Sequence, residues 1–343
     1  DESVYSGVVS LRSIRLVTFL AELNKLKLWG ADIGNAYLEA KTKEKVYIVA
    51  GAEFGDLAGH ILIIQKALYG LRTSGKRWAE TFAFTLKDLG FKRSKADPDV
   101  WMRKNKKLNV WEYIATFVDD VCLAMDDPES VVKAFREKYG YKVKGDGPLN
   151  YHLGITYARD KDGTLYYHAK RYIERLIGMY ERLFGEKPVH AKSPLEKGDH
   201  PKLDESPLLN YEGVRQYQSL IGALQWLISL GRIDIATAVM TMSRFRACPR
   251  VGHLERVRRM VGFVDKMKHA CIHIRTNLPD YSDLPKRDYS WLHSIYGKVK
   301  ELLPSDLPEP LGKVVQITTY KDANLYHDMV TGRAVTGILH LLN

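Results

Sequence analysis

Two adjacent carboxylates, Asp119 and Asp120, interrupt an apolar run that extends from Tyr113 to Met125. The flanking sequences, YIATFV and VCLAM, are rich in β-branched and aromatic residues, so the pattern predicts two buried strands joined by a tight turn that carries both acids. Two like charges this close repel each other unless a cation lies between them, and their hard oxygen ligands favour Mg²⁺ or Mn²⁺ over zinc. Asp is also a common turn residue, so the pair by itself is equally typical of an ordinary turn.

A third acid, Asp32, lies upstream at the end of a short apolar stretch that begins at Trp29. The residues before it, 11–28, place apolar side chains at helical spacing, so we expect an amphipathic helix that leads into a strand. A two-metal site for phosphoryl transfer needs acids from separate elements that hold both cations between the attacking and the leaving oxygen. Asp32 together with Asp119 and Asp120 supplies such a set.

The composition favours a polyanionic partner and an intracellular protein. The 343 residues are enough for two or three domains, and 52 Lys and Arg against 41 Asp and Glu give a net charge of +11. Three widely spaced cysteines, Cys122, Cys248 and Cys271, indicate neither a disulfide framework nor a paired-cysteine zinc site. No apolar run approaches the roughly 18 residues of a membrane span, and the first residues lack the pattern of a signal peptide, so we expect no membrane partner.

Five motifs in order along the chain resemble the reverse transcriptase of copia-type LTR retrotransposons. They are ADIGNAYLEA at 31–40, KALYGLRTSGKRWAETF at 66–82, GFKRSKADPDVWMRK at 90–104, FVDD at 117–120 and YHLGI at 151–155. The resemblance implies an α+β fold with the palm, fingers and thumb of a right-hand polymerase, a helical connection and the beginning of an RNase H-like domain. It also implies an RNA-directed DNA polymerase that extends a DNA primer on an RNA template with dNTPs.

The resemblance implies that Asp32, Asp119 and Asp120 are the catalytic acids. Together with the backbone carbonyl of Ile33, they would hold two Mg²⁺ (or Mn²⁺) ions. Phe117 stands where the family more often has Tyr. In the same way Tyr37 corresponds to an aromatic beneath the sugar of the incoming nucleotide, where it would exclude a 2′-hydroxyl. A core tyrosine at the start of a helix is the alternative interpretation.

Gly70 and Val118 are the further nucleotide-binding residues that the resemblance implies, and a glycine suits a close backbone approach. The cations at the following helix start, Arg72, Lys76 and Arg77, suit contacts with template or primer phosphates. A basic amphipathic helix is also often only a solvated face.

The YHLGI motif resembles the element that grips the primer strand, which points to Tyr151 and Gly154 as primer contacts. Before it, we expect a helix followed by a loop rich in Lys and Gly. In related polymerases a lysine near this loop can protonate the pyrophosphate leaving group. Lys142 and Lys144 are both candidates, and the sequence leaves the choice between them open.

The resemblance divides the chain into four parts. Residues 1–155 form partial fingers and the palm, 156–189 a thumb-like region that opens with a hairpin, 190–312 a linker and helical connection, and 313–343 the truncated start of an RNase H-like domain. Asp322 matches the first metal-binding aspartate of that last domain. Because such a site needs further carboxylates, we expect no RNase H activity from residues that end at 343.

Within the helical connection, Asp234 is expected to cap a helix N-terminus. The sequences ERVRRM and DKMKHA predict a basic helix that could lie along the duplex backbone. His269, Cys271 and His273 alternate in KHACIHIR, so on a strand they share one face. A metal site is one interpretation of this pattern, and a plain strand is the other.

Two functional alternatives remain at this stage. One is a truncated or decayed copy that binds nucleic acid without catalysis, because the fingers expected before residue 1 carry basic residues for the triphosphate. The other is a basic scaffold, which leaves the three acids unexplained. The resemblance further implies a parent Pol polyprotein active in DNA integration and a cytoplasmic particle with a nuclear phase, while the oligomeric state stays open.

Overall fold

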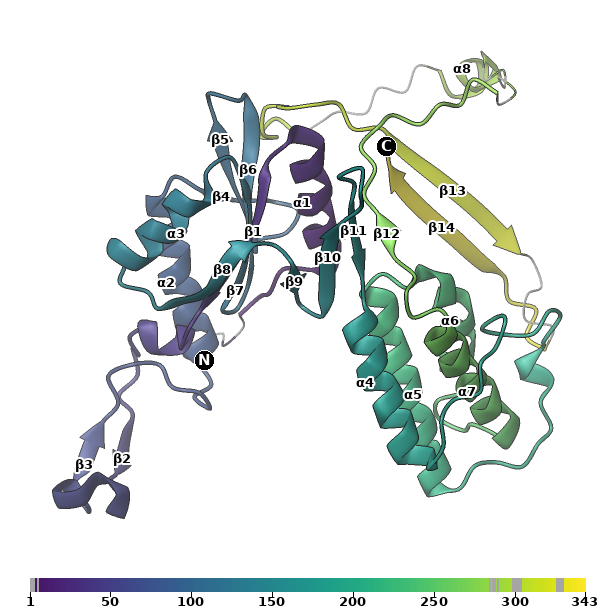
Figure 1. The fold of residues 1–343 in the computed structure, drawn as a ribbon, viewed down its shortest axis with the longest axis horizontal. Helices are drawn as coiled ribbons and strands as arrows, with labels where there is room; N and C mark the ends of the chain where they lie inside the picture. The colour runs from purple at the N-terminus through teal and green to yellow at the C-terminus, as the bar shows by residue number, and fades with distance from the viewer. Residues whose placement is uncertain are drawn as a thin grey trace.

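The computed structural model describes residues 4, 6–283, 285, 288, 290–297, 304–324 and 330–343. A central sheet packed with helices forms one end of the described chain (Figure 1). A group of helices lies at the other end, with a small sheet between the two. Two separate β-ribbons, β2–β3 and β13–β14, extend along the outside.

The central sheet has six strands in the order β4-β5-β6-β7-β1-β8, and every neighbouring pair is antiparallel. Its strands are β1 (Lys27–Ile33), β4 (Lys92–Arg93), β5 (Val100–Asn105), β6 (Val110–Phe117), β7 (Asp120–Met125) and β8 (Val143–Pro148). The predicted helix before β1 is present as α1 (Leu11–Asn24). Its N-cap, Ser10, accepts a hydrogen bond from the backbone N–H of Ser13, which explains why the helix begins there.

The predicted hairpin is confirmed as β6–β7. Phe117 pairs with Asp120, so Val118 and Asp119 alone form the turn and Asp120 is already the first residue of β7. Val118 has φ of 57°, a left-handed conformation that is strained for a β-branched residue. Its carbonyl accepts a hydrogen bond of 2.6 Å from the indole N–H of Trp78, so contacts from outside the hairpin hold this turn.

The two faces of the sheet contact different layers. Helices α2 (Ser74–Asp88) and α3 (Pro128–Glu137) cover one face, where Ile33 and Leu123 share a core with Phe82 and Phe135. Helix α1 and the small sheet cover the other, where Leu28 and Ala124 belong to a second core with α1. Because side chains alternate along a strand, Asp32 and Asp120 belong to the face that α1 covers further along.

The segment that contains KGDGP is a strand, β8, and not the loop that we expected from its glycines and proline. It pairs with β1, and backbone hydrogen bonds extend the pairing at both ends, from Gly34 N–H to Lys142 O at 2.7 Å and from Leu149 N–H to Leu28 O at 3.0 Å. The backbone groups of β1 need partners on this side, and that requirement outweighs the low strand propensity of the segment. The register shifts between Gly30 and Asp32.

The small sheet has the order β12-β11-β10-β9. Its strands are β9 (Tyr151–His152), β10 (Ile155–Arg159), β11 (Leu165–His168) and β12 (Ile272–His273). The hairpin expected around residues 161–163 is confirmed as β10–β11. Since β9 pairs with β10, the predicted division at residue 155 runs through a β-hairpin.

Four helices follow and share one core with this sheet: α4 (Lys170–Phe184), α5 (Tyr211–Ser229), α6 (Ala236–Ser243) and α7 (Val251–Lys266). Asp234 does not cap α6. It lies in a short 3₁₀ turn (Ile233–Ile235), and its carboxylate accepts hydrogen bonds of 2.9 and 2.7 Å from the buried guanidinium of Arg232, while Ile235 is the N-cap. The Asp234 carboxylate is therefore bound to the neighbouring guanidinium instead of capping the helix N-terminus.

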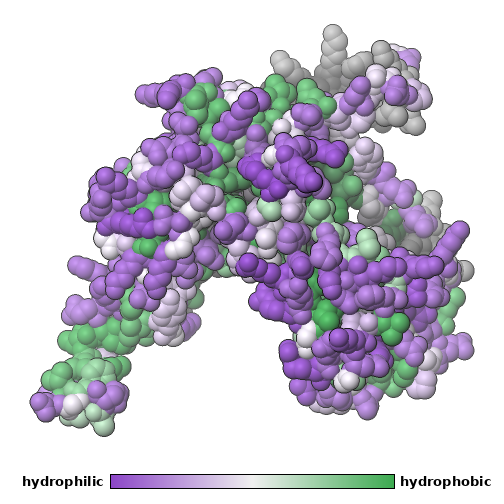
Figure 2. Space-filling model, in the orientation of Figure 1, coloured by the Kyte–Doolittle hydropathy of each residue, from purple (hydrophilic) through white to green (hydrophobic). Residues whose placement is uncertain are grey.

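The six-stranded sheet with α1, α2 and α3 is termed the sheet body. The β2–β3 ribbon (Tyr47–Val49 and Ile61–Ile63) projects from it. Tyr47 pairs with Ile63 and Val49 with Ile61, so these four side chains share one face, and all are exposed. Figure 2 shows this projection as a largely apolar surface at the lower left. The remaining helix of the described residues is α8 (Ser290–Tyr296). None of the described helices is both long and apolar enough to cross a bilayer.

A buried hydroxyl pair provides a test of this packing. Tyr141 Oη and Thr85 Oγ1 lie 2.6 Å apart, and both residues are buried where α2 meets the segment that leads into β8. We expect Tyr141→Phe and Thr85→Val each to lower the free energy of unfolding by about 1–2 kcal/mol. Each substitution removes one hydroxyl of the pair and leaves the other buried without this hydrogen-bond partner. The double variant should cost less than the sum, as measured by urea unfolding; strict additivity would contradict a direct interaction.

Candidate active site

The antiparallel pairing of β1 with β7 brings the acids together. Asp32 is the direct cross-strand partner of Asp120, which places both side chains on one face of the sheet. Asp119 stands next to them in the turn, and its backbone carbonyl accepts a hydrogen bond of 2.9 Å from Ile33 N–H. The Ile33 side chain is fully buried, so only its backbone could reach an ion. Two strands and one turn thus supply the three predicted acids.

Burial and neighbouring negative charges raise the pKa values of Asp32 and Asp120. Burial raises the pKa of Asp120 to about 6, and the neighbouring Asp119 and Asp32 add to the effect. Burial and the charge of Asp119 also raise the pKa of Asp32, while Lys144 opposes this increase. An ionised cluster here is costly unless a cation joins it.

The donor set fits a hard divalent cation, since carboxylate and carbonyl oxygens are the ligands that Mg²⁺ and Mn²⁺ prefer. Within the described residues, no three His, Cys, Asp or Glu side chains converge closely enough to hold an ion without rearrangement. Asp32, Asp119 and Asp120 therefore carry the oxygen ligands that Mg²⁺ prefers, but their carboxylates would have to move closer together to coordinate one ion.

The structure separates the two candidate lysines. Lys144 in β8 is the cross-strand partner of Asp32, on the side of β1 away from Asp120, and its side chain passes over Gly34. A Cβ at Gly34 would lie 2.9 Å from Lys144 Cε, so a glycine lets the lysine stem approach. Lys142 contributes its backbone carbonyl to Gly34 N–H. Lys144 is thus the lysine whose position is tied to an acid.

Tyr37 lies next to an aromatic that the sequence did not single out. Its ring centroid is 4.6 Å from that of Tyr69, which is 64% exposed. Burial raises the pKa of Tyr69, and the charges of Asp119 and Asp32 add to this increase. An aromatic directly before Gly70 in a motif already linked to the nucleotide was the signal available for this residue.

The predicted cations at the start of α2 have different environments. Arg72 is exposed, and Lys76 is half-buried with its amine 4.0 Å from Glu80. Arg77 is buried and forms an ion pair of 3.1 Å with Glu80 in the same helix. Arg72 and Lys76 are therefore the members of this group at the surface, and Gly70, with φ of 99°, occupies a conformation that favours glycine just before them.

Tyr151 and Gly154 connect the sheets to the helices. The Tyr151 ring is 39% exposed and has the Arg171 guanidinium 4.8 Å from its centroid. Gly154 has φ of 89°, and a Cβ there would contact Leu230 at 3.5 Å. The intervening His152 is buried, and burial lowers its pKa to about 4. The turn of this hairpin thus lies against the residue that ends α5.

A groove of about 1230 Å³ lies between the sheet body and α5. Its lining includes Phe117, which directly precedes the Val118–Asp119 turn, and Trp226, a 44% exposed indole on α5. Arg12, Lys76 and Arg93 add positive charge, with Glu80 and two further carboxylates also in the lining. The groove therefore joins the region of the acids to an exposed aromatic on the helical part.

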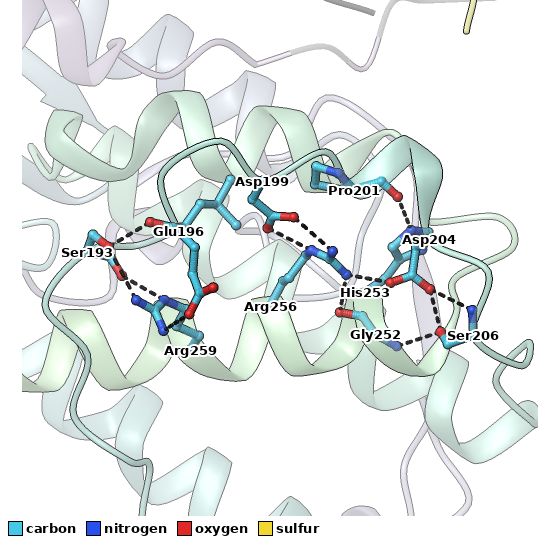
Figure 3. Close-up of polar contacts among 11 residues, drawn as sticks. Ser193, Glu196, Asp199, Pro201, Asp204, Ser206, Gly252, His253, Arg256 and Arg259 are labelled. Atoms are coloured by element: carbon cyan, nitrogen blue, oxygen red, sulfur yellow. Dashed lines mark hydrogen bonds and ion pairs between the residues drawn. The ribbon is translucent and has the colours of Figure 1, made fainter. Parts of the chain in front are cut away.

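Helix α7 is the basic helix predicted around ERVRRM, but its arginines are already paired within the protein. These arginines form ion pairs with residues 186–206, the segment between α4 and α5, which we term the acidic strap. Figure 3 shows the pairs of Arg256 and Arg259. Arg256 donates to Asp199 at 2.8 Å and to Asp204 at 2.5 Å. The charge of ERVRRM is largely neutralised inside the molecule, so duplex binding by this helix would require the strap to leave.

Other contacts extend the strap along α7. Arg259 pairs with Glu196 at 2.9 Å, and Arg258 pairs with Glu186 and donates to Tyr180 Oη at 2.9 Å. At the start of the helix, a ring nitrogen of His253 bonds Pro201 O at 2.9 Å. The linker predicted at the start of the 190–312 region is therefore fixed to one helix.

Asp322 lies in β13 (Ile317–Asn324), exposed and opposite Gly337 of β14 (Val335–Leu342). The two strands form a separate ribbon. No metal-binding group of three or more His, Cys, Asp or Glu includes Asp322 in the part of the chain that the structure describes.

Comparison with known proteins decides the family. The family described as reverse transcriptase (RNA-dependent DNA polymerase) matches residues 1–189, more than half of the chain. The chain belongs to this reverse transcriptase family. Its fold is accordingly that of a polymerase domain, and the predicted resemblance is confirmed.

Relatives among curated proteins are Pol polyproteins of copia-type transposons. The Retrovirus-related Pol polyprotein from transposon RE1 of Arabidopsis thaliana is 27% identical over 76% of this chain. The putative transposon Ty5-1 protein of Saccharomyces cerevisiae is 25% identical over 71%, and the Pol polyprotein from transposon TNT 1-94 of Nicotiana tabacum is 26% identical over 79%. The chain spans 17% of the RE1 protein and 21% of the TNT 1-94 protein, but 78% of the Ty5-1 protein.

The acidic strap gives a stability prediction. Arg256→Ala should lower the free energy of unfolding by about 2–3 kcal/mol, because it leaves two largely buried carboxylates, Asp199 and Asp204, without their partner. Arg259→Ala, whose partner Glu196 is 70% exposed, should cost less than about 1 kcal/mol. Urea unfolding measures both; equal effects would contradict the ranking.

The same contact predicts how acid acts on the strap. Burial raises the pKa of Asp204, but hydrogen bonds from Ser206 and Arg256 outweigh it and hold the pKa below its ordinary value. The stabilisation by Asp204 is therefore present above the ordinary Asp pKa of about 4 and is lost as the pH falls through the lowered value. The hydrogen-exchange protection factors of residues 193–206, which correct for the intrinsic pH dependence of exchange, should fall in acid. Arg256→Ala should lower them already at neutral pH.

Proposed function

We propose that this chain performs templated nucleotidyl transfer at Asp32, Asp119 and Asp120. The observation that carries the proposal is the cross-strand pairing of Asp32 with Asp120 beside the two-residue turn. In this proposal the central sheet is the palm, the β2–β3 ribbon belongs to the fingers, and the helices that follow residue 156 form the thumb-like region and connection.

The reaction transfers a nucleotide to the primer. The primer 3′-oxygen forms a bond to the α-phosphorus of the dNTP, the bond from that phosphorus to the bridging oxygen breaks, and pyrophosphate leaves. The three acids and the Ile33 carbonyl are the groups that would hold two divalent ions, which in such sites activate the attacking oxygen and stabilise charge on the leaving oxygen. Lys144 is our candidate donor of a proton to the pyrophosphate, and its cross-strand pairing with Asp32 in the β1–β8 ladder supports this role.

The nucleotide sugar is proposed to lie against the Tyr37–Tyr69 pair. These two rings contact each other. Burial raises the pKa of Tyr69, and the charges of Asp119 and Asp32 add to this increase. Gly70 permits a close backbone approach beside them, and Val118 contributes the turn backbone. A tyrosine held by a second ring is a fixed obstacle, which is what steric exclusion of a 2′-hydroxyl requires.

The primer–template duplex is proposed to occupy the groove between the sheet body and α5. Arg12, Lys76 and Arg93 would contact phosphates, which attract cations without reading sequence. Trp226 offers a flat apolar face to the sugars and bases. Arg72 and Tyr151, which are exposed members of their motifs, are proposed as further contacts with the duplex.

Binding without catalysis is the second candidate function, because no three acids converge closely enough to hold an ion among the described residues. It is distinguished from the first by measuring duplex binding and primer extension on the same preparation. Under either function the partner is an RNA–DNA duplex inside the cell.

Removing the turn acids should abolish primer extension. The Asp119→Asn, Asp120→Asn double variant should lose at least about 100-fold in extension rate on an RNA template with dNTPs and Mg²⁺ or Mn²⁺, since even groups that only orient metal ligands are worth about 10–100-fold. Duplex affinity should change little. If parent and variant both bind the duplex and neither extends the primer, the binding-only function stands.

Lys144 and Lys142 form a matched pair of variants. Lys144→Met should lower kcat about 100-fold, the smaller end of general-acid effects, with a small change in KM for the dNTP. Lys142→Met should be nearly silent, since that residue contributes its carbonyl. Lys144→Arg separates the roles: arginine keeps the charge beside Asp32 but does not release a proton, so full activity of this variant would exclude general-acid catalysis.

A further inference from the structure

A thiol and an imidazole lie side by side on the outer face of the small sheet, away from the polymerase acids. Tyr166 pairs with His273 and Tyr167 with Ile272. Tyr167 and Ile272 point into the core, so alternation places Cys271 and His273 on the opposite face. Both are exposed, and nothing in the polymerase reaction uses them.

Three groups of this face form a connected chain. Cys271 Sγ lies 3.9 Å from His273 Nδ1, and His273 Nε2 lies 2.7 Å from Asp160 Oδ2 in the β10–β11 turn. An ionised carboxylate only accepts hydrogen bonds, so Nε2 must carry the ring proton. In the neutral ring Nδ1 therefore presents its lone pair, and it does so next to the sulfur.

We propose that Cys271 and His273 bind a thiophilic transition-metal ion of the Zn²⁺ class, with Asp160 as the carboxylate that orients the imidazole. In tetrahedral zinc sites Zn–S is about 2.3 Å and Zn–N about 2.0–2.1 Å, which separates sulfur and nitrogen by about 3.6 Å. The observed 3.9 Å is within a small side-chain adjustment of that value. A metal-bound imidazole whose other nitrogen bonds a carboxylate is a recurrent arrangement of zinc sites.

The neighbouring histidines differ in their availability. His168 Nδ1 accepts a hydrogen bond of 3.2 Å from Lys170 N–H, so its proton is fixed on the other nitrogen. His269 is exposed two residues before Cys271. No third side chain is already in place among the described residues. The site thus has two protein ligands with its other positions facing solvent, and it should bind more weakly than a four-ligand structural site.

A catalytic thiol fits this geometry less well. Burial and the charge of Asp160 raise the pKa of Cys271, whereas a nucleophilic cysteine needs a lowered one. A bound metal ion overcomes this by displacing the thiol proton. Sulfur and nitrogen ligands also keep this site chemically separate from the oxygen ligands of the acids, which select Mg²⁺ or Mn²⁺.

Co²⁺ is the spectroscopic probe, added to the reduced chain with excess Mg²⁺ present to occupy oxygen sites. We expect a thiolate-to-Co²⁺ charge-transfer band in the near ultraviolet, and displacement of that band by Zn²⁺. Cys271→Ser should abolish the band and His273→Ala should abolish or strongly weaken it. Asp160→Asn should reduce affinity about 10–100-fold, as expected for loss of an orienting carboxylate.

Cys248→Ser is the matched control, since Cys248 is also exposed and unpaired by disulfide, and it should leave the band unchanged. The altered side chains are at the surface, so unfolding measured without metal should be the same for all variants. The proposal is overturned if the parent shows no charge-transfer band, or if Cys271→Ser retains the band that Cys248→Ser loses. An Asp160→Asn variant that binds as tightly as the parent removes Asp160 from the site.

Discussion

The pairing of β1 with β7 is the constraint on which the rest of the site depends. It sets Asp32 opposite Asp120, a like-charge cross-strand pair that would ordinarily weaken a sheet. The cost is offset on the other face, where Ile33 and Leu123 lie in a core with α2 and α3. The strained turn at Val118 is held in the same way, by a hydrogen bond from Trp78 on α2. The layer behind the sheet therefore maintains an arrangement of charges that the sheet alone would not favour.

The distribution of charge matters more for nucleic-acid binding than the net value of +11. The arginines of α7 are paired with the acidic strap, and Arg77 is paired inside α2. Other cations, Arg12, Lys76 and Arg93, line the groove that also contains Phe117, the residue before the Val118–Asp119 turn. The helical part thus uses arginines to fix its own linker, and a basic helix in a sequence does not by itself identify a duplex-binding surface.

Local patterns were sufficient for elements whose partners are near in sequence. The β-branched and aromatic residues around Asp119 predicted the β6–β7 hairpin, and helical spacing predicted α1. β8 and the acidic strap could not be predicted this way, because each is defined by a partner more than 40 residues away: β1 for the KGDGP strand and α7 for the strap. Tyr69 was not singled out because its contact with the Tyr37 ring exists only in the folded chain. Asp234 shows the converse, where a nearby buried Arg232 outcompetes a capping role that the sequence favoured.

The position of β1 between two partners also explains why one carboxylate can face charges of opposite sign. Asp32 has Asp120 across one edge of its strand and Lys144 across the other. Side chains alternate with a period of two, so a slip of one residue in either pairing would turn its partner to the opposite face. The irregularity between Gly30 and Asp32 shifts the β8 register at this point, and without it Lys144 would not align with the acid. Gly34 then leaves space for the lysine stem. The proton donor proposed for the leaving group is thus positioned by the same strand that positions the metal ligands, so a change in register would disturb both together.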